Sequence, residues 1–318
     1  DEMQTAFSIL MSGEATVAQI TSFMISLKMR GENATDIAAG ASQMRANATR
    51  INAPENSIDI VGTGGDGANS LNISTAAAII VAGCNVPVAK HGNKAVSSKS
   101  GAADILNELG INLECDVSLI EKAIIKAGIC FLMAPRHHPA LRHVGPTRVE
   151  LGVRTIFNLL GPLSNPALVD KALIGVYDAK WARPCAEALN LLGTKHAFIV
   201  HGDGGLDEVS LSGPTLVQAL DSGNITEFVI NPSDFGISCE SIESIKGGDP
   251  KYNASKLEEL LSGKTGPYRN IACMNAATAL VATKNENRLI DAFKRAEHAI
   301  DTGSAKSVLN KLVQITNS

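Results

Sequence analysis

The chain of 318 residues has little excess charge, no closely paired cysteines and no long uninterrupted apolar run. Its net charge of −4 argues against a nucleic-acid partner, because surfaces that bind nucleic acids depend on an excess of Lys and Arg. The longest apolar stretch, residues 76–89, is interrupted by Asn85 and Pro87 and does not form a membrane span. We therefore expect neither nucleic acid nor a membrane among the partners of this protein.

The cysteines are scattered and mostly lie in apolar surroundings, which predicts buried, reduced thiols and a cytoplasmic location. The first residues have no signal-peptide pattern, and because the chain does not begin with Met we expect it to be trimmed. His137, His138 and His143 form a group that suggests zinc. The chain has no Cys-x-x-Cys pair and no His-Glu-x-x-His motif, so a zinc site is disfavoured.

Hydrophobic periodicity predicts two kinds of region along the chain. Residues 1 to about 50 carry apolar side chains at helical spacing, with helices expected at 16–27 and 35–45 and a break at Gly31. Beyond Pro54, short apolar strands alternate with helices, and residues 275 to about 313 are helical. We expect strands at 58–61, 86–89, 130–134, 173–177 and 197–200, and helices at 103–109, 117–127 and 181–192.

This alternation predicts an α/β fold with a mostly parallel central sheet. Residues 135–166 interrupt it, and their pattern is that of a helix bounded by loops. We expect this segment to return to the N-terminal helices, so that a small, discontinuous N-terminal α-helical domain comprises residues 1–53 and about 138–166. The large α/β domain then comprises residues 54–137 and 167–318.

The run Gly62-Thr63-Gly64-Gly65-Asp66-Gly67 lies between the first apolar strand and an apolar helix that includes residues 76–82. A glycine turn between a parallel strand and a helix presents backbone N–H groups and a helix N-terminus to a phosphate. Asn72, Ser74 and Thr75 add amide and hydroxyl groups at the start of the helix. The segment therefore predicts a phosphate-bearing substrate, whereas a purely structural turn would leave these polar groups unexplained.

Two better-known nucleotide motifs do not fit the chain. Gly62, Gly64 and Gly67 match the Gly-x-Gly-x-x-Gly fingerprint of dinucleotide-binding folds, which expects an acidic residue about 20 positions further on. No Asp or Glu occurs between Asp66 and Asp104. A Walker loop is also excluded, because Glu258 stands where its first glycine belongs, ahead of residues 263–265.

Polar residues follow other predicted strands as well. Lys90-His91-Gly92-Asn93 follows the second strand, Arg136-His137-His138 the third, and a glycine-rich loop containing Asp207-Glu208 the last. Ligands of open parallel sheets bind outside the carboxyl ends of the strands, so these loops predict one active-site edge. Adjacent carboxylates beside a phosphate site indicate Mg²⁺, the alternative being a solvated acidic turn.

Together, these residues resemble the anthranilate phosphoribosyltransferase family. The matching motifs are residues 62–66, 72–75, 90–93 and 97–101, Arg148 within Gly-Pro-Thr-Arg, and Asp207-Glu208, in order and along nearly the whole chain. The resemblance implies transfer of the 5-phosphoribosyl group of phosphoribosyl pyrophosphate to the amine of anthranilate, with release of pyrophosphate, in tryptophan biosynthesis. It also implies Mg²⁺, a fold of the nucleoside phosphorylase/phosphoribosyltransferase type, and a homodimer joined through the small domains.

The resemblance also implies roles for individual residues. Anthranilate would contact Gly62, Asn93 and Arg148, and Mg²⁺ would be held by Ser74, Asp207 and Glu208. One position departs from the family pattern, since Ala102 stands where a Ser commonly follows the Ser-Gly pair and a hydroxyl contact to the substrate is lost. Phosphoribosyl pyrophosphate would be bound by Gly62, Gly65, Asp66, Ser70, Asn72, Ile73, Ser74, Thr75, Lys90, His91, Gly92, Asn93, Lys94, Ala95, Val96, Ser97, Ser98 and the position of Ala102.

Several alternatives stay open for single residues. Arg148 suits the anthranilate carboxylate because its planar guanidinium donates two parallel hydrogen bonds, but it could instead form a surface ion pair with Glu150. His91 stacks on the aromatic ring of the substrate or serves the structure alone. Lys90 fits a phosphate contact better than a general base. We assign no acid or base, and expect catalysis by positioning and by electrostatic stabilisation of an oxocarbenium-like ribosyl centre.

Three other functions are weighed against this one. A pyrimidine nucleoside phosphorylase shares the two-domain plan but has a further C-terminal domain and lacks the Lys-His-Gly-Asn motif. A phosphoribosyltransferase with another aromatic acceptor would lack Asn93 or Arg148, and both are present. A non-catalytic sensor of phosphoribosyl pyrophosphate would lack the carboxylates of Asp207 and Glu208, which are also present.

Overall fold

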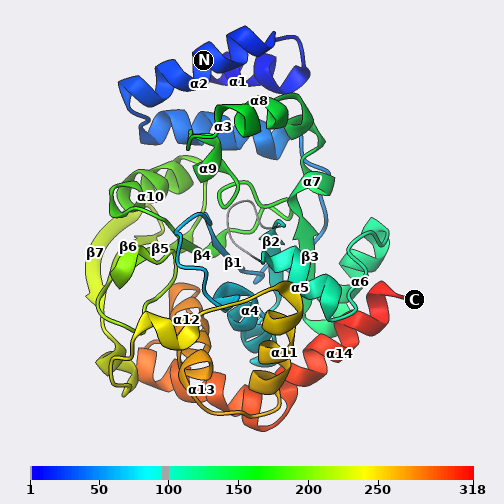
Figure 1. The fold of residues 1–318 in the computed structure, drawn as a ribbon, viewed down its shortest axis with the longest axis vertical. Helices are drawn as coiled ribbons and strands as arrows, with labels where there is room; N and C mark the ends of the chain where they lie inside the picture. Colours follow the sequence, from blue (N-terminus) through cyan, green and yellow to red (C-terminus); the bar gives the residue numbers. More distant parts are fainter. Residues whose placement is uncertain (1, 95–99) are drawn as a thin grey trace.

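The computed structural model describes residues 2–94 and 100–318. Its N-terminal part is formed by three helices, α1 (Glu2–Ser12), α2 (Val17–Arg30) and α3 (Ala34–Ala46), which lie together at one end of the molecule (Figure 1). Helix α2 begins with a capping box between Thr16 and Gln19 and ends at Gly31, whose φ of 88° suits glycine. The helices predicted at 16–27 and 35–45 are therefore confirmed.

Five strands form the main sheet, in the order β1-β4-β5-β6-β7. Strands β1 (Asp59–Gly62), β4 (Lys171–Gly175) and β5 (His196–Gly202) are parallel, while β6 (Thr215–Asp221) and β7 (Asn224–Ile230) continue the sheet antiparallel. Strands β2 (Val88–Gly92) and β3 (Ile129–Met133) form a second, parallel sheet, which a parallel bridge between Ile58 and Val88 connects to the first. The predicted α/β fold with a mostly parallel sheet is confirmed.

The two faces of the main sheet are covered by different helices. Successive strand residues point to opposite faces, so Ile60 and Leu173 join one core cluster while Val61 and Ile174 join the other. The helices of the α/β part are α4 (Ile73–Gly83), α5 (Ala102–Glu108), α6 (Val117–Ala127), α10 (Ala182–Leu191), α11 (Pro250–Leu261), α12 (Pro267–Ala282), α13 (Leu289–Asp301) and α14 (Ser304–Thr316), with 3₁₀ turns η2 (Ala179–Trp181), η3 (Asp203–Gly205), η4 (Pro232–Phe235) and η5 (Ile242–Ile245). The first cluster contains helices α4, α12, α13 and α14, and the second contains α10 and the N-terminal helices.

The segment after β3 is more broken than the single helix expected from the sequence. It forms α7 (Ala134–His137), η1 (Pro139–His143), α8 (Gly145–Leu151) and α9 (Phe157–Leu160), because Pro139 and Gly152 interrupt it. Helix α8 contacts α2, α9 contacts α3, and the rings of Phe7 and Phe157 lie 5.8 Å apart. We propose on these contacts that residues 1–53 and about 138–166 form one discontinuous domain and residues 54–137 and 167–318 the other.

The cysteines follow the expected pattern with one exception. All six are free; Cys84, Cys115, Cys130, Cys185 and Cys273 are buried, while Cys239 is exposed. Within residues 2–94 and 100–318, no helix has the length and apolar character needed to cross a membrane.

Candidate functional site

Three neighbouring parallel strands end in glycine beside the predicted acidic pair. These are Gly62 of β1, Gly175 of β4 and Gly202 of β5. A Cβ atom at Gly62 would lie 2.3 Å from Oδ2 of Asp207, and one at Gly175 would lie 1.6 Å from the Asp207 carbonyl oxygen. A Cβ atom at Gly202 would lie 2.5 Å from the carbonyl oxygen of Glu208. The strand ends therefore allow the backbone of the acidic loop to cross directly over the sheet edge.

The glycine loop after β1 is fixed to the same acidic residue. The N–H of Gly64 donates to Oδ2 of Asp207 at 2.6 Å, and the N–H of Thr63 donates to the carbonyl of Gly175 at 2.9 Å. Gly64, Gly65 and Gly67 have φ values of 69°, 73° and 78°, a region that glycine adopts without strain. The predicted turn is thus present, and Asp207, 143 residues away in the chain, holds it.

The first turn of α4 receives the second carboxylate and a buried lysine. The N–H of Ser74 donates to Oε1 of Glu208 at 3.0 Å. The ammonium of Lys90, which is 2% exposed, donates to the carbonyl of Ile60 at 2.7 Å and lies 3.4 Å from the Ser74 hydroxyl. The Thr75 hydroxyl is buried and has no hydrogen-bond partner among residues 2–94 and 100–318. Ser74, Lys90 and Glu208 therefore form one polar group at the N-terminus of α4.

The electrostatics of this group suit an added cation. Burial, followed by the charge of Asp66, raises the pKa of Asp207 to about 7. Burial and the charge of Asp207 raise the pKa of Glu208 well above its ordinary value, and Lys90 only partly opposes this. A divalent cation would relieve the repulsion between these carboxylates. Within the described ranges, no group of three or more His, Cys, Asp and Glu side chains forms a cluster that could hold a metal ion.

Asn72 is oriented by a chain of hydrogen bonds. The N–H of Gly248 donates to Oδ1 of Asn253 at 2.8 Å, so Nδ2 of Asn253 is the atom that donates to Oδ1 of Asn72 at 2.9 Å. The amide nitrogen of Asn72 therefore points the other way, 3.4 Å from the carbonyl of Ser100. Nearby, Ser70 forms a β-bridge with Lys246. Ile73 is buried in the core, so only its backbone is available to a ligand.

The end of β2 is fixed by a buried carboxylate, that of Asp59, which accepts hydrogen bonds from His91 and Asn165. The N–H of His91 donates to Oδ1 of Asp59 at 3.0 Å, and Nδ2 of Asn165 donates to Oδ2 of Asp59 at 2.7 Å. Burial raises the pKa of Asp59 to about 6, against the opposing effect of Lys90. The His91 ring is 2% exposed, lies 3.1 Å from the carbonyl of Gly161 through Nδ1, and packs edge-on against His138. His91 is thus held by protein groups on several sides.

The other predicted residues lie around this edge. Gly92 packs against Phe131, since a Cβ atom there would lie 2.8 Å from Cε2 of that ring. Asn93 is exposed, its carbonyl accepts from the N–H of Ala103 and its Oδ1 accepts from the N–H of Lys94. Ala102 begins α5. Ala95, Val96, Ser97 and Ser98 lie outside the described residues.

Arg148 does not form the surface ion pair that the sequence left open. No carboxylate in the described part of the chain, Glu150 included, forms a salt bridge with it. Its guanidinium carbon lies 5.4 Å from the centre of the Phe157 ring, and burial lowers its pKa. The side chain is thus held by an aromatic face and keeps its donors available for an anion.

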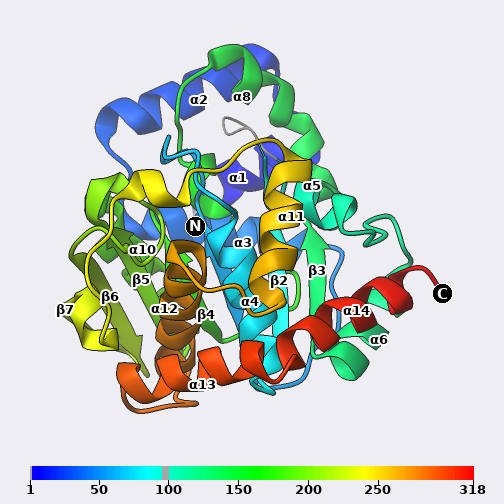
Figure 2. The ribbon, with the colours of Figure 1, turned by 60° about the horizontal axis from the view of Figure 1, so that its bottom comes forward.

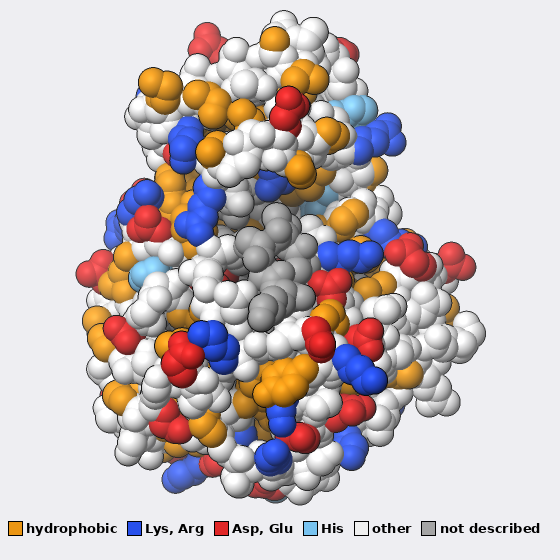
Figure 3. Space-filling model, viewed as in Figure 1, with side chains coloured by type: hydrophobic (Ala, Val, Ile, Leu, Met, Phe, Trp, Pro, Cys, Tyr) orange, Lys and Arg blue, Asp and Glu red, His pale blue; other side chains and the backbone are white. Residues whose placement is uncertain are grey.

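Arg154 is a site-edge residue that the sequence analysis missed. Its guanidinium donates to the carbonyl of Gly65 and stacks 4.1 Å from the centre of the Tyr177 ring. It thereby ties the segment after α8 to the glycine loop. Nothing in the local sequence around Arg154 marks it for this contact, because Gly65 lies 89 residues earlier. Figure 3 shows Lys and Arg side chains on this face of the molecule, in the region between the N-terminal helices and the α/β part.

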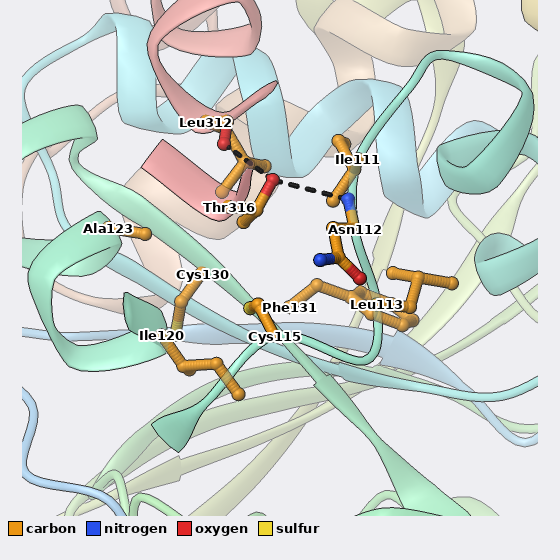
Figure 4. A pocket seen from close by; sticks show the side chains of 10 residues that line it. All are labelled: Ile111, Asn112, Leu113, Cys115, Ile120, Ala123, Cys130, Phe131, Leu312 and Thr316. Carbon is orange, nitrogen blue, oxygen red and sulfur yellow. Dashed lines mark hydrogen bonds between the residues drawn. The ribbon is translucent and has the colours of Figure 1, made fainter. Parts of the chain in front are cut away.

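A small cavity lies between α14, α6 and β3 (Figure 4). It is lined mainly by apolar side chains, including Cys130 and Leu312. Its hydroxyl, on Thr316, accepts from the N–H of Asn112 at 3.2 Å and donates to the carbonyl of Leu312 at 3.0 Å. These groups satisfy one another, so the cavity belongs to the packing of α14 rather than to the strand-end edge.

Comparisons with known proteins match the whole chain. Residues 1–48 match the helical bundle domain, and residues 54–306 the a/b domain, of the glycosyl transferase family. The anthranilate phosphoribosyltransferase of Parvibaculum lavamentivorans is 51% identical over 99% of this chain and 93% of its own length. That of Azospirillum brasilense is 52% identical over 100% of this chain and 89% of its own.

Solved structures agree with these relatives. A crystal structure of anthranilate phosphoribosyltransferase from Thermus thermophilus is 38% identical and superimposes with a TM-score of 0.95, covering 100% of this chain and 95% of that one. The Saccharomyces cerevisiae enzyme in complex with PRPP and Mg is 31% identical, with a TM-score of 0.91, covering 99% and 92%.

Proposed function

The chain belongs to the anthranilate phosphoribosyltransferase family, and from this premise we propose which of its residues perform the reaction. The enzyme transfers the 5-phosphoribosyl group of phosphoribosyl pyrophosphate to the amine of anthranilate. The bond between the ribose C1 atom and the pyrophosphate oxygen breaks, a bond from C1 to the amine nitrogen forms, and the amine gives up a proton. The products are N-(5-phosphoribosyl)anthranilate and pyrophosphate, in the tryptophan biosynthesis pathway.

One observation carries the assignment of the phosphoribosyl pyrophosphate site. The glycine loop 62–67, the first turn of α4 and the end of β2 meet at the sheet edge where Asp207 and Glu208 cross it. A glycine turn and a helix N-terminus present backbone N–H groups that favour phosphate oxygens. The ligand residues we propose among those described are Gly62, Gly65, Asp66, Ser70, Asn72, Ile73, Ser74, Thr75, Lys90, His91, Gly92, Asn93, Lys94 and Ala102.

The metal cofactor of the reaction is Mg²⁺. We assign it to Ser74, Asp207 and Glu208, which supply the hydroxyl and carboxylate oxygens that this ion prefers. The raised pKa values of Asp207 and Glu208 support the assignment, since they reflect burial of both carboxylates and the repulsion from the neighbouring charges of Asp66 and Asp207, respectively. Bound there, Mg²⁺ neutralises charge on pyrophosphate and stabilises it as a leaving group.

The residues of the chain then contribute position and charge. Lys90 is buried beside Ser74, and its contacts with the carbonyl of Ile60 and the hydroxyl of Ser74 fix the direction of its ammonium. Asp59 holds the end of β2 through the His91 N–H, and with it the position of Asn93. Such preorganised groups position the substrates and, in the case of the Lys90 ammonium, stabilise negative charge on the departing pyrophosphate without reorganising during the reaction.

Anthranilate is assigned to Gly62, Asn93 and Arg148. The support for Arg148 is its position over Phe157 and its lack of a carboxylate partner in the described ranges. A planar guanidinium donates two parallel hydrogen bonds to a carboxylate, which fixes the acceptor ring as well as its charge. The exposed Asn93 lies directly after β2, and because its Oδ1 accepts from the N–H of Lys94, its Nδ2 is the donor that we assign to anthranilate.

Dimerisation and location are further parts of this proposal. We propose a homodimer joined through the helical part, supported by the exposed apolar side chains of Val17 and Met29 on α2, Ile9 on α1 and Val149 on α8. Light scattering should give twice the chain mass, and Met29→Glu should reduce it. We propose a cytoplasmic location on the basis of the six free cysteines.

The test of the function is the loss of anthranilate fluorescence on mixing with phosphoribosyl pyrophosphate, with and without Mg²⁺. Loss that requires all three components supports the transferase and its metal together. Binding of phosphoribosyl pyrophosphate without any loss of fluorescence would reject anthranilate as the acceptor and keep the phosphate site.

A further inference from the structure

Asn275, on helix α12, holds the backbone directly after the acidic pair. Its Oδ1 accepts from the N–H of Val209 at 2.8 Å, and its Nδ2 donates to the carbonyl of Val209 at 3.0 Å. Nδ2 also donates to the carbonyl of Ile271 at 2.9 Å, one turn earlier in the same helix. The side chain is fully buried. Asn275 therefore joins the acidic loop to α12 through both of its amide ends.

The orientation of this amide is fixed by the backbone. The N–H and the carbonyl of Val209 cannot exchange roles, so only one arrangement of Oδ1 and Nδ2 satisfies both. Helix α12 in turn packs against β4 and β5, the strands whose terminal glycines the acidic loop crosses (Figure 2). Turning the Asn275 side chain away would leave a buried amide without hydrogen-bond partners, which costs free energy. The contact between Asn275 and Val209 is therefore rigid as well as specific.

The carboxylates of Asp207 and Glu208 have hydrogen-bond partners of their own, away from Asn275. Gly64 donates to Asp207 and Ser74 donates to Glu208, so both carboxylates face the glycine loop and the first turn of α4. Each of these two bonds ends on a carboxylate oxygen that we assign to Mg²⁺. Asn275 is different, because it forms hydrogen bonds with the backbone of Val209 and does not itself occupy an oxygen of Asp207 or Glu208 that the metal would use.

We infer that Asn275 is a positioning residue for the divalent cation, acting through the backbone of Val209 to set the distance and direction of the Asp207 and Glu208 carboxylates. This inference rests on the proposed metal site. Residues that orient metal ligands without touching the metal typically change affinity by about 10- to 100-fold when they are replaced.

The test uses two replacements and a matched control. Asn275→Ala removes the three hydrogen bonds and leaves a small cavity, whereas Asn275→Leu removes the same bonds and fills the space. Thr278→Ala is the control, because Thr278 is also fully buried on α12 and, among the described residues, its hydroxyl donates only to the carbonyl of Met274 in the same helix. Thermal melting of all three variants identifies any that fails to fold. If one of the two Asn275 variants does not fold, the other still tests the inference.

Two readouts follow the loop itself. Calorimetry of Mg²⁺ binding in the presence of phosphoribosyl pyrophosphate, without anthranilate and therefore without turnover, should show affinity weakened about tenfold or more in both Asn275 variants and unchanged in Thr278→Ala. Hydrogen exchange of the peptide containing residues 206–210 should become faster in the Asn275 variants only. The KM for anthranilate should stay near that of the wild type at saturating Mg²⁺, because the hydrogen bonds of Asn275 go to Val209 and Ile271 and not to a residue assigned to anthranilate.

The outcomes separate the inference from the function on which it rests. Wild-type Mg²⁺ affinity in folded Asn275→Ala and Asn275→Leu overturns the positioning role, even if both melt at lower temperature. An equal loss in Thr278→Ala overturns it too, since the effect then belongs to α12 in general. If Asp207→Ala binds Mg²⁺ as tightly as the wild type, the proposed metal site fails first, and the inference fails with it.

Discussion

Gly175 and Asp207 approach so closely that no side chain fits between them: a Cβ atom on Gly175 would lie 1.6 Å from the Asp207 carbonyl oxygen. Gly175→Ala must therefore displace the acidic loop or the end of β4, and we expect Mg²⁺-dependent binding of phosphoribosyl pyrophosphate to be lost. Calorimetry checks the binding, with a lower melting temperature as a second sign. Gly145→Ala is the matched control, because a Cβ atom there meets nothing within 4 Å. Similar losses in both variants would contradict the explanation.

Removal of an acidic side chain should abolish use of the metal. In Asp207→Ala we expect the rate to fall by about 100-fold or more, with no recovery at high Mg²⁺, because a ligand is missing rather than weakened. The measurement is the initial rate of anthranilate fluorescence loss across a Mg²⁺ titration. Asp203→Asn, in the same loop region but exposed, should stay near the wild-type rate. Wild-type turnover in Asp207→Ala would exclude it as a metal ligand.

The stability of the metal-free protein should depend on pH through Asp207. Its pKa is about 7 in the folded protein, against about 3.9 in an unfolded chain. Between these values the folded state holds a proton that the unfolded state has released, so this group lowers the free energy of unfolding as pH rises from about 4 to 7. Asp207→Asn lacks the group and should be more stable than the wild type at pH 8, by on the order of 1 kcal/mol or more.

This advantage should shrink as pH falls towards and below about 4, because the wild-type carboxyl is then protonated in the folded state and increasingly also in the unfolded state. Urea denaturation without Mg²⁺ at several pH values measures the difference. With saturating Mg²⁺ and phosphoribosyl pyrophosphate the order should reverse, because ligand binding stabilises only the protein that retains the site. A difference independent of pH would show that the Asp207 carboxyl titrates alike in the folded and unfolded states.

The sequence predicted those parts of the site whose signals are local. The glycine loop and the Asp207-Glu208 pair each follow a strand that its own apolar residues mark, and Lys90 lies within another, β2, which extends further than the predicted 86–89. The parallel arrangement brings the strand ends together. The β6–β7 hairpin was not predicted. Strand β7 is exposed along most of its length, so it lacks an alternating pattern, and only the Ser222-Gly223 turn, with φ values of 48° and 93°, marks the connection.

The supporting residues could not be predicted, because their partners are distant in the chain. Asn275 grips Val209, 66 residues away, and Asn253 orients Asn72, 181 residues away. Asn occurs in many buried and capping positions, so neither residue type nor spacing identifies these roles. The role of the strand-end glycines 175 and 202 is easier to predict, since a glycine at the end of a parallel strand indicates that another backbone approaches closely there.

The orientation of Asn72 should depend on Asn253. Asn253→Asp keeps an acceptor for the N–H of Gly248 but has no hydrogen to donate to Oδ1 of Asn72. We expect the Asn72 amide to turn over, presenting oxygen instead of nitrogen at the phosphate site, and the Kd for phosphoribosyl pyrophosphate to rise several-fold or more. Calorimetry measures the Kd, and Asn190→Asp, an exposed change of equal charge, is the control. Unchanged affinity in Asn253→Asp would exclude Asn72 as a phosphate contact.

Arg148 should determine the choice of acceptor through the carboxylate of anthranilate. Arg148→Lys keeps the charge but loses the planar pair of donors, so we expect the KM for anthranilate to rise about tenfold while that for phosphoribosyl pyrophosphate stays constant. Aniline, which lacks the carboxylate, provides the sharper comparison. The ratio of kcat/KM for anthranilate over aniline should collapse in Arg148→Ala and persist in Arg142→Ala, an exposed arginine of the preceding turn. If the ratio survives in Arg148→Ala, another residue holds the carboxylate, and Arg154, the other arginine at the site edge, becomes the next to replace.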